Sequence, residues 1–335
     1  MKVIITGAGG YIGSIATQIF LKRNFEVVAM DNFTTGFKKP LQILQEEFGK
    51  DKLRFYGIDI KDDLNPILNK EGNAEAVIHF AANCLVDDSM RNPQKYFQNN
   101  VCGSQNLLTA MLKYGIKNMV FSSTCSVYGE VQQTPIRENH PLNPTNPYGQ
   151  SKKMVEEIIK WYGELLGLNY VILRYFNVCG ASEDGKIGDS KKPSPHLVQN
   201  AVRSALEIEN FSLTCQEVNT PDKTPIRDYV NVVDLAEAHI KAVDYLIKKG
   251  SSEIINLGTG EGNSVLEIIN VVQRETGKKI DIKKSNPERM GEYSKIIASI
   301  DKAKEKLNWQ PQKTLGDSIN SLITWYEKHP QGWDY

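Results

Sequence analysis

Short apolar runs alternate along this chain with longer stretches in which apolar residues recur at helical spacing. The runs occupy residues 3–5, 27–30, 53–58, 76–80, 119–122, 170–174 and 254–257. Runs of this length predict buried strands, and the stretches between them predict amphipathic helices. Strands that alternate with helices are typical of an α/β fold built on a doubly wound parallel sheet. In such a sheet, functional side chains gather beyond the carboxyl ends of the strands.

The first strand runs into a glycine-rich segment, residues 7–13, which reads Gly-Ala-Gly-Gly-Tyr-Ile-Gly and precedes a helical stretch. Small residues let the backbone approach a pyrophosphate, and the first amides of a helix are unsatisfied donors with partial positive charge. Strand, glycine turn and helix together predict a Rossmann-type dinucleotide site. Asp31 ends the second strand, about 20 residues beyond the turn, where a carboxylate accepts from ribose hydroxyls and repels a 2′-phosphate. The predicted cofactor is therefore NAD rather than NADP.

Polar or small residues stand at the ends of the other predicted strands. They are Asp59, Phe80-Ala81-Ala82, Ser122-Ser123-Thr124 and Tyr175-Phe176-Asn177. Because these positions follow parallel strands, the switch-point rule predicts that they gather at one edge of the sheet.

The strand pattern breaks after Asn177 into a polar, glycine-rich stretch. We expect a Rossmann-type NAD-binding domain in residues 1–177, joined by about 231–261. A smaller mixed α/β substrate-binding lobe is expected in about 178–230 and 262–335, because no flexible linker separates two independent units.

Composition narrows the class of protein. The 335 residues include 40 Lys plus Arg and 40 Asp plus Glu, so the formal charge is balanced. Without a basic block or an apolar run of membrane length, the sequence predicts neither a nucleic-acid nor a membrane partner. The five cysteines are scattered without metal or disulfide spacing, so we expect a cytoplasmic protein with reduced thiols and no metal site. His79, at a strand end, is interpreted as a packed residue rather than a catalyst.

Tyr148 and Lys152 lie four residues apart, a spacing that places them on one face of a helix. An ordinary phenol titrates near about 10, and a neighbouring ammonium lowers its pKa by favouring the phenolate. Tyr148 is therefore a candidate base. Thr124 is a candidate partner, since its hydroxyl could hydrogen-bond the same substrate oxygen and hold it within reach of proton transfer.

The glycine turn, Thr124 and the Tyr148/Lys152 pair together resemble the extended short-chain dehydrogenase/reductase superfamily over nearly the whole chain. Further motifs narrow the resemblance to the UDP-glucose (UDP-galactose) 4-epimerase family: His-Phe-Ala-Ala at 79–82, Arg-Tyr-Phe-Asn-Val at 174–178, Arg-Asp-Tyr-Val at 227–230, Asn-Leu-Gly-Thr-Gly at 256–260 with Ser-Val at 264–265, and His-Pro-Gln-Gly at 329–332. The resemblance implies an isomerase of galactose metabolism and UDP-sugar supply that keeps NAD tightly bound. In that family the sugar is oxidised at C4, the 4-keto sugar turns over, and reduction on its opposite face inverts C4.

The resemblance also implies residue roles. Tyr148 is the base and acid, Lys152 lowers its pKa and contacts the nicotinamide ribose, and Thr124 orients the 4-oxygen. The implied cofactor-binding residues are Gly7, Gly10, Tyr11, Ile12, Gly13, Asp31, Asn32, Asp59, Ile60, Phe80, Ala81, Ala82, Asn99, Ser122, Tyr148, Lys152 and Tyr175. The implied UDP-sugar-binding residues are Thr124, Asn177, His196, Leu197, Arg227, Arg289, Glu292 and Ile296. Among these, Arg227 and Arg289 would clamp the diphosphate.

Three departures from related patterns bear on the chemistry. Cys125 and Ser126 stand where sugar-nucleotide 4,6-dehydratases have an acidic pair, so dehydration loses its acid and base. The segment 86–89 reads Val-Asp-Asp-Ser where the family often has Val-Gly-Glu-Ser, which predicts a new charge near the sugar. Asn231 stands where a histidine often follows Arg-Asp-Tyr.

Other functions and substrates stay open from the sequence. Counted from Arg289, Ile296 occupies the position whose size governs acceptance of N-acetylated sugars, so UDP-N-acetylglucosamine, UDP-N-acetylgalactosamine and UDP-pentoses are alternative substrates. A non-catalytic sensor of dinucleotide or nucleotide sugar would share the fold but would not need hydroxyl, phenol and ammonium together. A one-way ketoreductase would release NADPH, and Asp31 argues against it. The amphipathic stretches 93–114 and 152–166 correspond to helices that pair in relatives, which implies a homodimer.

Overall fold

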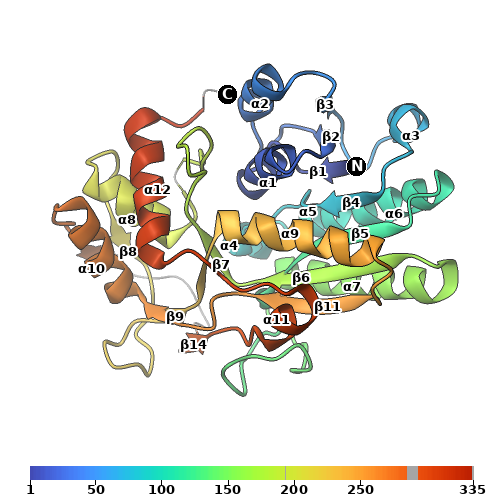
Figure 1. Cartoon of the computed structure of the whole chain (residues 1–335). Coiled ribbons are helices and arrows are strands. Elements are labelled where there is room, and N and C mark those ends of the chain that lie inside the picture. Colours follow the sequence, from blue (N-terminus) through green and yellow to red (C-terminus); the bar gives the residue numbers. More distant parts are fainter. Residues whose placement is uncertain (193, 285–292, 334–335) are drawn as a thin grey trace.

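A seven-stranded parallel sheet forms the centre of the computed structural model, which describes residues 1–192, 194–284 and 293–333 (Figure 1). Its strands are β1 (Lys2–Thr6), β2 (Glu26–Asp31), β3 (Leu53–Gly57), β4 (Ala76–His79), β5 (Asn118–Thr124), β6 (Asn169–Tyr175) and β11 (Glu253–Leu257). Their order is β11-β6-β5-β4-β1-β2-β3. The strand order reverses between β1 and β4, so the predicted Rossmann-type sheet is confirmed, with its switch point beside the glycine turn.

Alternate residues of each strand face opposite sides of the sheet. Both sides are covered by hydrophobic cores, which is why the strands of the sheet appear in the sequence as short, fully apolar runs. Val3 and Ile5 of β1 belong to one hydrophobic core, and Ile4 belongs to the other. The first core is covered by α1 (Tyr11–Lys22), α2 (Lys39–Phe48), α9 (Val232–Ile247) and α11 (Asp301–Leu307). The second is covered by α3 (Asn65–Glu71), α6 (Gly103–Lys113) and α7 (Pro147–Leu166).

The two amphipathic stretches predicted at 93–114 and 152–166 are helical, with two differences. The first consists of α5 (Pro93–Tyr96), a π-helical segment (Phe97–Cys102) and α6, and it follows the short α4 (Val86–Arg91). The second begins earlier than predicted, at Pro147. The side chain of Asn146 accepts from the Gly149 amide at 2.8 Å, and proline suits the first helical position, so both residues favour the earlier start.

A second group of helices and short strands packs at one end of the sheet. In Figure 1, α8 (Leu197–Ala205), α10 (Val265–Thr276) and α12 (Leu315–Lys328) stand together, and they share a third core that includes Val202, Ile268, Leu322 and Trp325. The capping boxes Ser264/Glu267 and Thr314/Asp317 begin α10 and α12. The predicted smaller mixed α/β unit is therefore present.

Short strands connect this unit to the central sheet. Strand β7 (Asn177–Cys179) pairs in parallel with β10 (Tyr229–Asn231). Strand β9 (Ile226–Arg227) lies between β12 (Asn263–Ser264), which is antiparallel to it, and β14 (Lys295–Ile296), which is parallel. A further pair joins β8 (Ser212–Leu213) and β13 (Lys283–Lys284). The chain returns to the main sheet at β11, as the sequence predicted for the strand near Ile254.

Candidate active site

Helix α7 carries the predicted tyrosine and lysine in its first two turns. Tyr148 is the second residue of the helix, and Lys152 lies one turn later. The Lys152 side chain is buried, its Nζ donates to the Ser122 carbonyl at 2.7 Å, and Nζ lies 4.7 Å from the centre of the Phe121 ring. These contacts hold the ammonium near the carboxyl end of β5.

A close backbone approach brings Tyr148 to Thr124. Thr124 is the last residue of β5, and a 3₁₀ turn (Cys125–Val127) follows it. A Cβ added at Gly149 would lie 2.5 Å from the Ser126 carbonyl oxygen, so only glycine lets the helix start this near the turn. Thr124 is near enough to the Tyr148 phenol to lower its pKa. The sequence pointed to both residues of this pair but not to the role of Gly149.

Burial dominates the electrostatics of the pair. Burial raises the pKa of Tyr148 well above its ordinary value, the nearby Cys84 thiol raises it further, and the hydrogen bond with Thr124 lowers it. Burial also lowers the pKa of Lys152 to about 8. Burial thus shifts both groups toward their neutral forms, although a pKa of about 8 leaves Lys152 mostly protonated at pH 7. The predicted lowering of the Tyr148 pKa by Lys152 stays a prediction.

The glycine turn between β1 and α1 has the close packing that a dinucleotide site requires. Gly7 has a φ of +71°, and a Cβ there would lie 2.5 Å from the Ala81 amide nitrogen. A Cβ at Gly13 would lie 2.1 Å from the Gly7 carbonyl oxygen. Gly10 is the N-cap of α1 and has no side-chain capping bond, so the first amides of the helix, at Tyr11 and Ile12, face the turn without a side-chain partner.

Asp31 is buried at the end of β2, where it organises the loop that follows. Its carboxylate accepts from the amides of Gly9 at 2.9 Å and Phe33 at 2.7 Å. Burial raises the pKa of Asp31, and these two hydrogen bonds oppose that shift. A carboxylate has about four lone-pair positions, so Asp31 keeps acceptor capacity for ribose hydroxyls.

The remaining predicted cofactor residues lie along the carboxyl edge of the sheet. Asn32 donates to Asp59 at 2.9 Å. Burial raises the pKa of Asp59, but hydrogen bonds from the Lys61 amide and from Asn32 outweigh that effect, so the pKa is lowered. Asn99 lies in the π-helical segment and donates to Asn100 at 3.1 Å. Phe80, Ala81 and Ala82 follow β4 beside the glycine turn, Ile60 is buried beside Gly103, and Ser122 holds Lys152.

Tyr175 and Tyr11 use their hydroxyls within the protein. The Tyr175 hydroxyl hydrogen-bonds Nε2 of His239, so its contribution to a cofactor site would come from the ring. The Tyr11 hydroxyl donates to the Gly180 carbonyl at 2.5 Å, and its ring lies 5.9 Å from that of His196, at the start of α8 before Leu197. Tyr11 therefore joins the glycine turn to the second unit.

Two of the predicted substrate residues, Arg227 and Ile296, lie near Cys125, which directly follows Thr124. Arg227 is paired with Ile296 in the β9/β14 register, and Arg227 Nη1 donates to the Ile226 carbonyl at 3.0 Å and the Tyr293 carbonyl at 2.8 Å. Burial raises the pKa of Cys125 to about 11, and the nearby Arg227 guanidinium opposes that shift. Ile296 and Cys125 both pack against the cluster around Val127 and Tyr128. Asn177 is exposed at the start of β7, and Arg289 and Glu292 lie outside the described residues.

Asp228 is a structural centre of this region that sequence reasoning did not single out, although it stands in the quoted Arg-Asp-Tyr-Val motif. Its fully buried carboxylate accepts from the Thr259 amide at 2.6 Å and hydroxyl at 2.7 Å, from the Gly260 amide at 3.0 Å and from the Ala298 amide at 3.2 Å. A Cβ at Gly258 would lie 2.4 Å from this carboxylate. Asp228 thus joins the 256–260 motif to the segment that carries Ile296.

Comparison with known proteins decides the family. A family model described as the NAD dependent epimerase/dehydratase family matches residues 3–258. The UDP-glucose 4-epimerase of Lactobacillus helveticus is 40% identical over 339 residues, covering 100% of this chain and 99% of the relative. The chain belongs to the UDP-glucose 4-epimerase family. The member from Bacillus subtilis is 35% identical over 344 residues and 99% of each chain.

Solved structures agree with this assignment. The crystal structure of UDP-glucose 4-epimerase from Bifidobacterium longum in complex with NAD+ and UDP has a TM-score of 0.93 and 33% identity, covering 99% of this chain and 100% of that one. The Brucella ovis enzyme in complex with NAD has a TM-score of 0.89 and 35% identity, covering 96% and 97%. The predicted family, isomerase class and NAD cofactor are therefore confirmed.

Two departures from the epimerase family pattern have local structural explanations. Asp88 in α4 forms an ion pair with Lys95 at 3.0 Å and accepts from the Tyr96 hydroxyl at 3.1 Å. The Tyr96 ring stands edge-on to that of Tyr148, with 6.4 Å between their centres, so the acidic segment supports the site through Tyr96. Asn231 caps α9 by accepting from the Val233 amide at 2.8 Å, which is a structural role.

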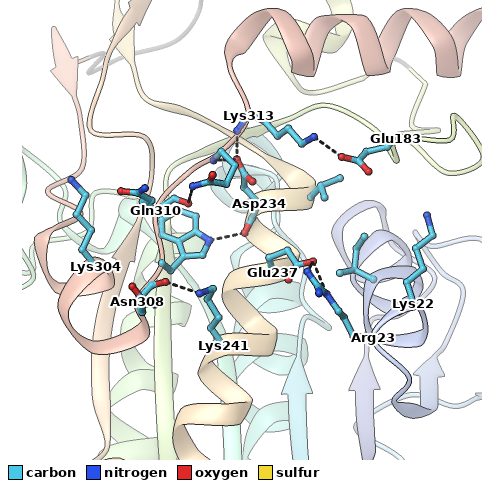
Figure 2. Close-up of a pocket in the computed structure, with 14 residues that line it drawn as sticks. Lys22, Arg23, Glu183, Asp234, Glu237, Lys241, Lys304, Asn308, Gln310 and Lys313 are labelled. Atoms are coloured by element: carbon cyan, nitrogen blue, oxygen red, sulfur yellow. Dashed lines mark hydrogen bonds and ion pairs between the residues drawn. The ribbon is translucent and has the colours of Figure 1, made fainter.

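A cavity of about 780 Å³ lies away from this site, between α1, α9 and the segment 304–313 (Figure 2). Among the residues that the structure describes, none of the predicted catalytic, cofactor or substrate residues lines it. Several of its cations have partners: Arg23 pairs with Glu237, Lys313 pairs with Glu183, and Lys241 donates to the Asn308 carbonyl at 2.6 Å. The cavity therefore does not belong to the candidate active site. Within the described residues, no group of three metal-ligating side chains occurs, and no helix has the length and apolarity to cross a membrane.

Proposed function

We propose that this member of the UDP-glucose 4-epimerase family interconverts UDP-glucose and UDP-galactose with resident NAD. The observation that carries the proposal is the contact between Thr124 and Tyr148, one helical turn from Lys152 and on the same sheet edge as the glycine turn. A site that only sensed a nucleotide sugar would have no use for a phenol, a hydroxyl and an ammonium at this edge.

The glycine turn fits NAD. The turn is too tight for any side chain at Gly7 or Gly13, so a pyrophosphate can meet backbone amides at the start of α1. Asp31 retains acceptor capacity for the adenosine ribose. The proposed binding residues are Gly7, Gly10, Tyr11, Ile12, Gly13, Asp31, Asn32, Asp59, Ile60, Phe80, Ala81, Ala82, Asn99, Ser122, Tyr148, Lys152 and Tyr175. When bound, NAD supplies the hydride acceptor and donor.

Tyr148 moves the proton. In its phenolate form it takes the proton of the sugar 4-hydroxyl, and after the sugar has turned over it returns that proton to the same oxygen. The Thr124 hydroxyl donates a hydrogen bond to the sugar 4-oxygen and keeps that oxygen within proton-transfer distance of Tyr148. Lys152, with a pKa of about 8, is largely protonated at neutral pH, and its charge favours the phenolate. The Ser122 carbonyl holds that charge in place.

The UDP group is held from the second unit while the sugar stays free to turn. Arg227 is the proposed diphosphate clamp, with Asn177, His196 and Leu197 as further contacts, and Ile296 faces the sugar. Arg289 and Glu292 are proposed on resemblance alone. We assign residues 1–177 with about 231–261 to NAD and about 178–230 with 262–335 to the UDP-sugar.

The enzyme works as a homodimer in the cytoplasm in this proposal. Met154, Trp161 and Leu165 are 38%, 58% and 68% exposed and recur along α7 on its side away from the sheet. An exposed apolar face of this kind suits pairing with a second copy. All five cysteines are free, as expected of a reducing compartment. Replacing Trp161 with glutamate should shift the sedimentation coefficient from dimer to monomer, and an unchanged coefficient would refute this surface.

The activity test needs no added cofactor. Purified protein is incubated with UDP-galactose, and UDP-glucose is followed by chromatography, with NAD released by denaturation and counted. Conversion is expected from the wild type. Tyr148→Phe should keep NAD and lose turnover by about a hundredfold or more, while Arg227→Ala should weaken UDP-sugar binding without emptying the NAD site. Protein that holds NAD but converts neither sugar would refute the proposed function.

A further inference from the structure

A buried histidine of α9 has no part in the proposed proton transfer, although it lies at the sheet edge where that transfer takes place. His239 is fully buried, and α9 packs against β5 and β6. The Nδ1 atom of His239 lies 2.8 Å from the Leu235 carbonyl oxygen, which can only accept, so Nδ1 carries the proton. Burial lowers the pKa of His239 to about 4, so the ring is neutral at pH 7 and its Nε2 is an acceptor.

The partner of this acceptor is Tyr175. The Tyr175 hydroxyl hydrogen-bonds Nε2 of His239, and because Nε2 carries no proton, the hydroxyl is the donor. The two rings meet edge-on, with 5.4 Å between their centres. Tyr175 ends β6 and is paired in the sheet register with Thr124, which ends β5. A hydrogen bond from α9 therefore fixes a ring beside the predicted catalytic threonine.

The same imidazole contacts a second ring at this edge. The centre of the Phe80 ring lies 4.7 Å from that of His239, and Phe80 directly follows β4. A Cβ at Gly7 would lie 2.8 Å from the Phe80 carbonyl carbon, so the Phe80 backbone packs against the glycine turn. Because β5 lies between β4 and β6, Phe80 and Tyr175 flank the end of β5. His239 thus joins the glycine turn to the Thr124 side of the site.

The course of the cofactor gives this connection a role. With the adenosine ribose at Asp31 and the pyrophosphate at the glycine turn, a dinucleotide that crosses the switch point extends its nicotinamide half over the ends of β4, β5 and β6. Phe80 and Tyr175 lie on that stretch, whereas the fully buried His239 is out of the cofactor's reach. We propose that His239 is a positioning residue that holds the rings of Tyr175 and Phe80 against the nicotinamide half of NAD and so keeps the cofactor resident. The inference rests on the proposed function, since it requires NAD to cross the switch point.

Deleting the hydrogen bond from either end tests this role. His239→Leu removes the acceptor, Tyr175→Phe removes the donor, and His239→Gln keeps an acceptor for the hydroxyl. These variants and the double variant His239→Leu/Tyr175→Phe are purified, and NAD loss during dialysis, thermal unfolding, and kcat and KM for UDP-galactose are measured. Each of the two deletions should lose NAD about tenfold faster than the wild type, because a buried polar group without its partner no longer holds the ring in place. The double variant should lose NAD no faster than the faster single variant, since both substitutions remove the same bond.

The controls separate this bond from a general loss of packing. His239→Gln should retain NAD nearly as the wild type does, and KM for UDP-galactose should stay unchanged in every variant, because the proposed UDP contacts come from the second unit. His140 is a matched control, since its Nδ1 lies 2.9 Å from the Pro141 carbonyl oxygen and its Nε2 accepts from the Gln132 amide at 3.1 Å. Its bonding pattern is that of His239, but its partners belong to its own loop, so His140→Leu should retain NAD as the wild type does.

Two results would overturn the inference and leave the proposed function intact. One is wild-type NAD retention in His239→Leu or Tyr175→Phe. The other is additive acceleration of NAD loss in the double variant, because the imidazole would then act only by filling space. Should His239→Leu fail to fold, Tyr175→Phe deletes the same bond, and its NAD retention decides alone. A wild type without any NAD would instead refute the proposed function.

Discussion

Replacing Gly149 with alanine should displace Tyr148 and slow catalysis while the protein stays folded. The new Cβ would lie 2.5 Å from the Ser126 carbonyl oxygen, 3.0 Å from its carbonyl carbon and 3.1 Å from Pro144 Cβ. Carbon and oxygen atoms in contact lie about 3.3–3.6 Å apart, so the start of α7 must move by roughly 1 Å. A displacement of that size at a reacting group costs about a hundredfold in rate.

The same substitution has an opposing effect on the helix itself. Alanine is favoured over glycine within a helix by about 1 kcal/mol, so part of the strain against Ser126 would be offset and the protein should remain folded. Gly316 offers a matched control, because it also lies in the first turn of a helix, α12, and a Cβ there would meet only ordinary contacts near 3.6 Å. Gly316→Ala should leave kcat unchanged.

The assay follows conversion of UDP-galactose to UDP-glucose at saturating substrate, with NAD content and thermal unfolding measured on the same samples. We expect Gly149→Ala to lose kcat by about a hundredfold while it keeps NAD and a cooperative unfolding transition. Wild-type kcat in Gly149→Ala would refute the reasoning, because the close approach of α7 to the turn after β5 would then not position Tyr148.

Three further predictions test the groups around the site. Asp228→Asn replaces one of the two accepting oxygens with an NH2 group, so at least one amide now bonded to the carboxylate would face a donor. The substitution should lower the free energy of unfolding by about 2–4 kcal/mol in chemical denaturation, and an unchanged midpoint would contradict this. Gly7→Ala brings a Cβ to 2.5 Å from the Ala81 amide nitrogen at a left-handed φ, and should reduce both NAD content and melting temperature, whereas full NAD occupancy would argue against the turn as the cofactor site. Burial lowers the pKa of His79 to about 3 and that of His239 to about 4. Between about pH 6.5 and 4 both imidazoles are therefore protonated in the unfolded chain but stay neutral in the folded protein. As the pH falls through this range, each ring should lower the free energy of unfolding by up to about 1.4 kcal/mol per pH unit. Denaturation midpoints that stay level over this range would rule that contribution out.

Local patterns explain why much of the fold and part of the site could be predicted. The strands of the main sheet are buried on both faces, so each appears as a short apolar run whatever its distant neighbours are. The positions of the glycine turn and Asp31 follow from backbone conformation and from one strand–turn–helix unit. His79 is buried and hydrogen-bonded to Thr6 and Ser104, in agreement with its interpretation as a packed residue. These features depend on neighbours close in sequence, and sequence patterns record such neighbours directly.

Sequence alone thus determined the sheet, the dinucleotide turn, and the helical spacing that puts Tyr148 and Lys152 on one face. Tertiary structure decided which distant residues meet them. Only the folded structure shows that the Ser126 carbonyl packs closely against Gly149. It alone also shows that the buried Asp228 carboxylate joins three segments of the chain through hydrogen bonds. The hydrogen bond between Tyr175 and His239 is likewise visible only in the folded chain. The reason is physical: a helix or turn arises from bonds over a few residues, whereas these contacts are fixed by the burial of whole elements against one another, which no local pattern encodes.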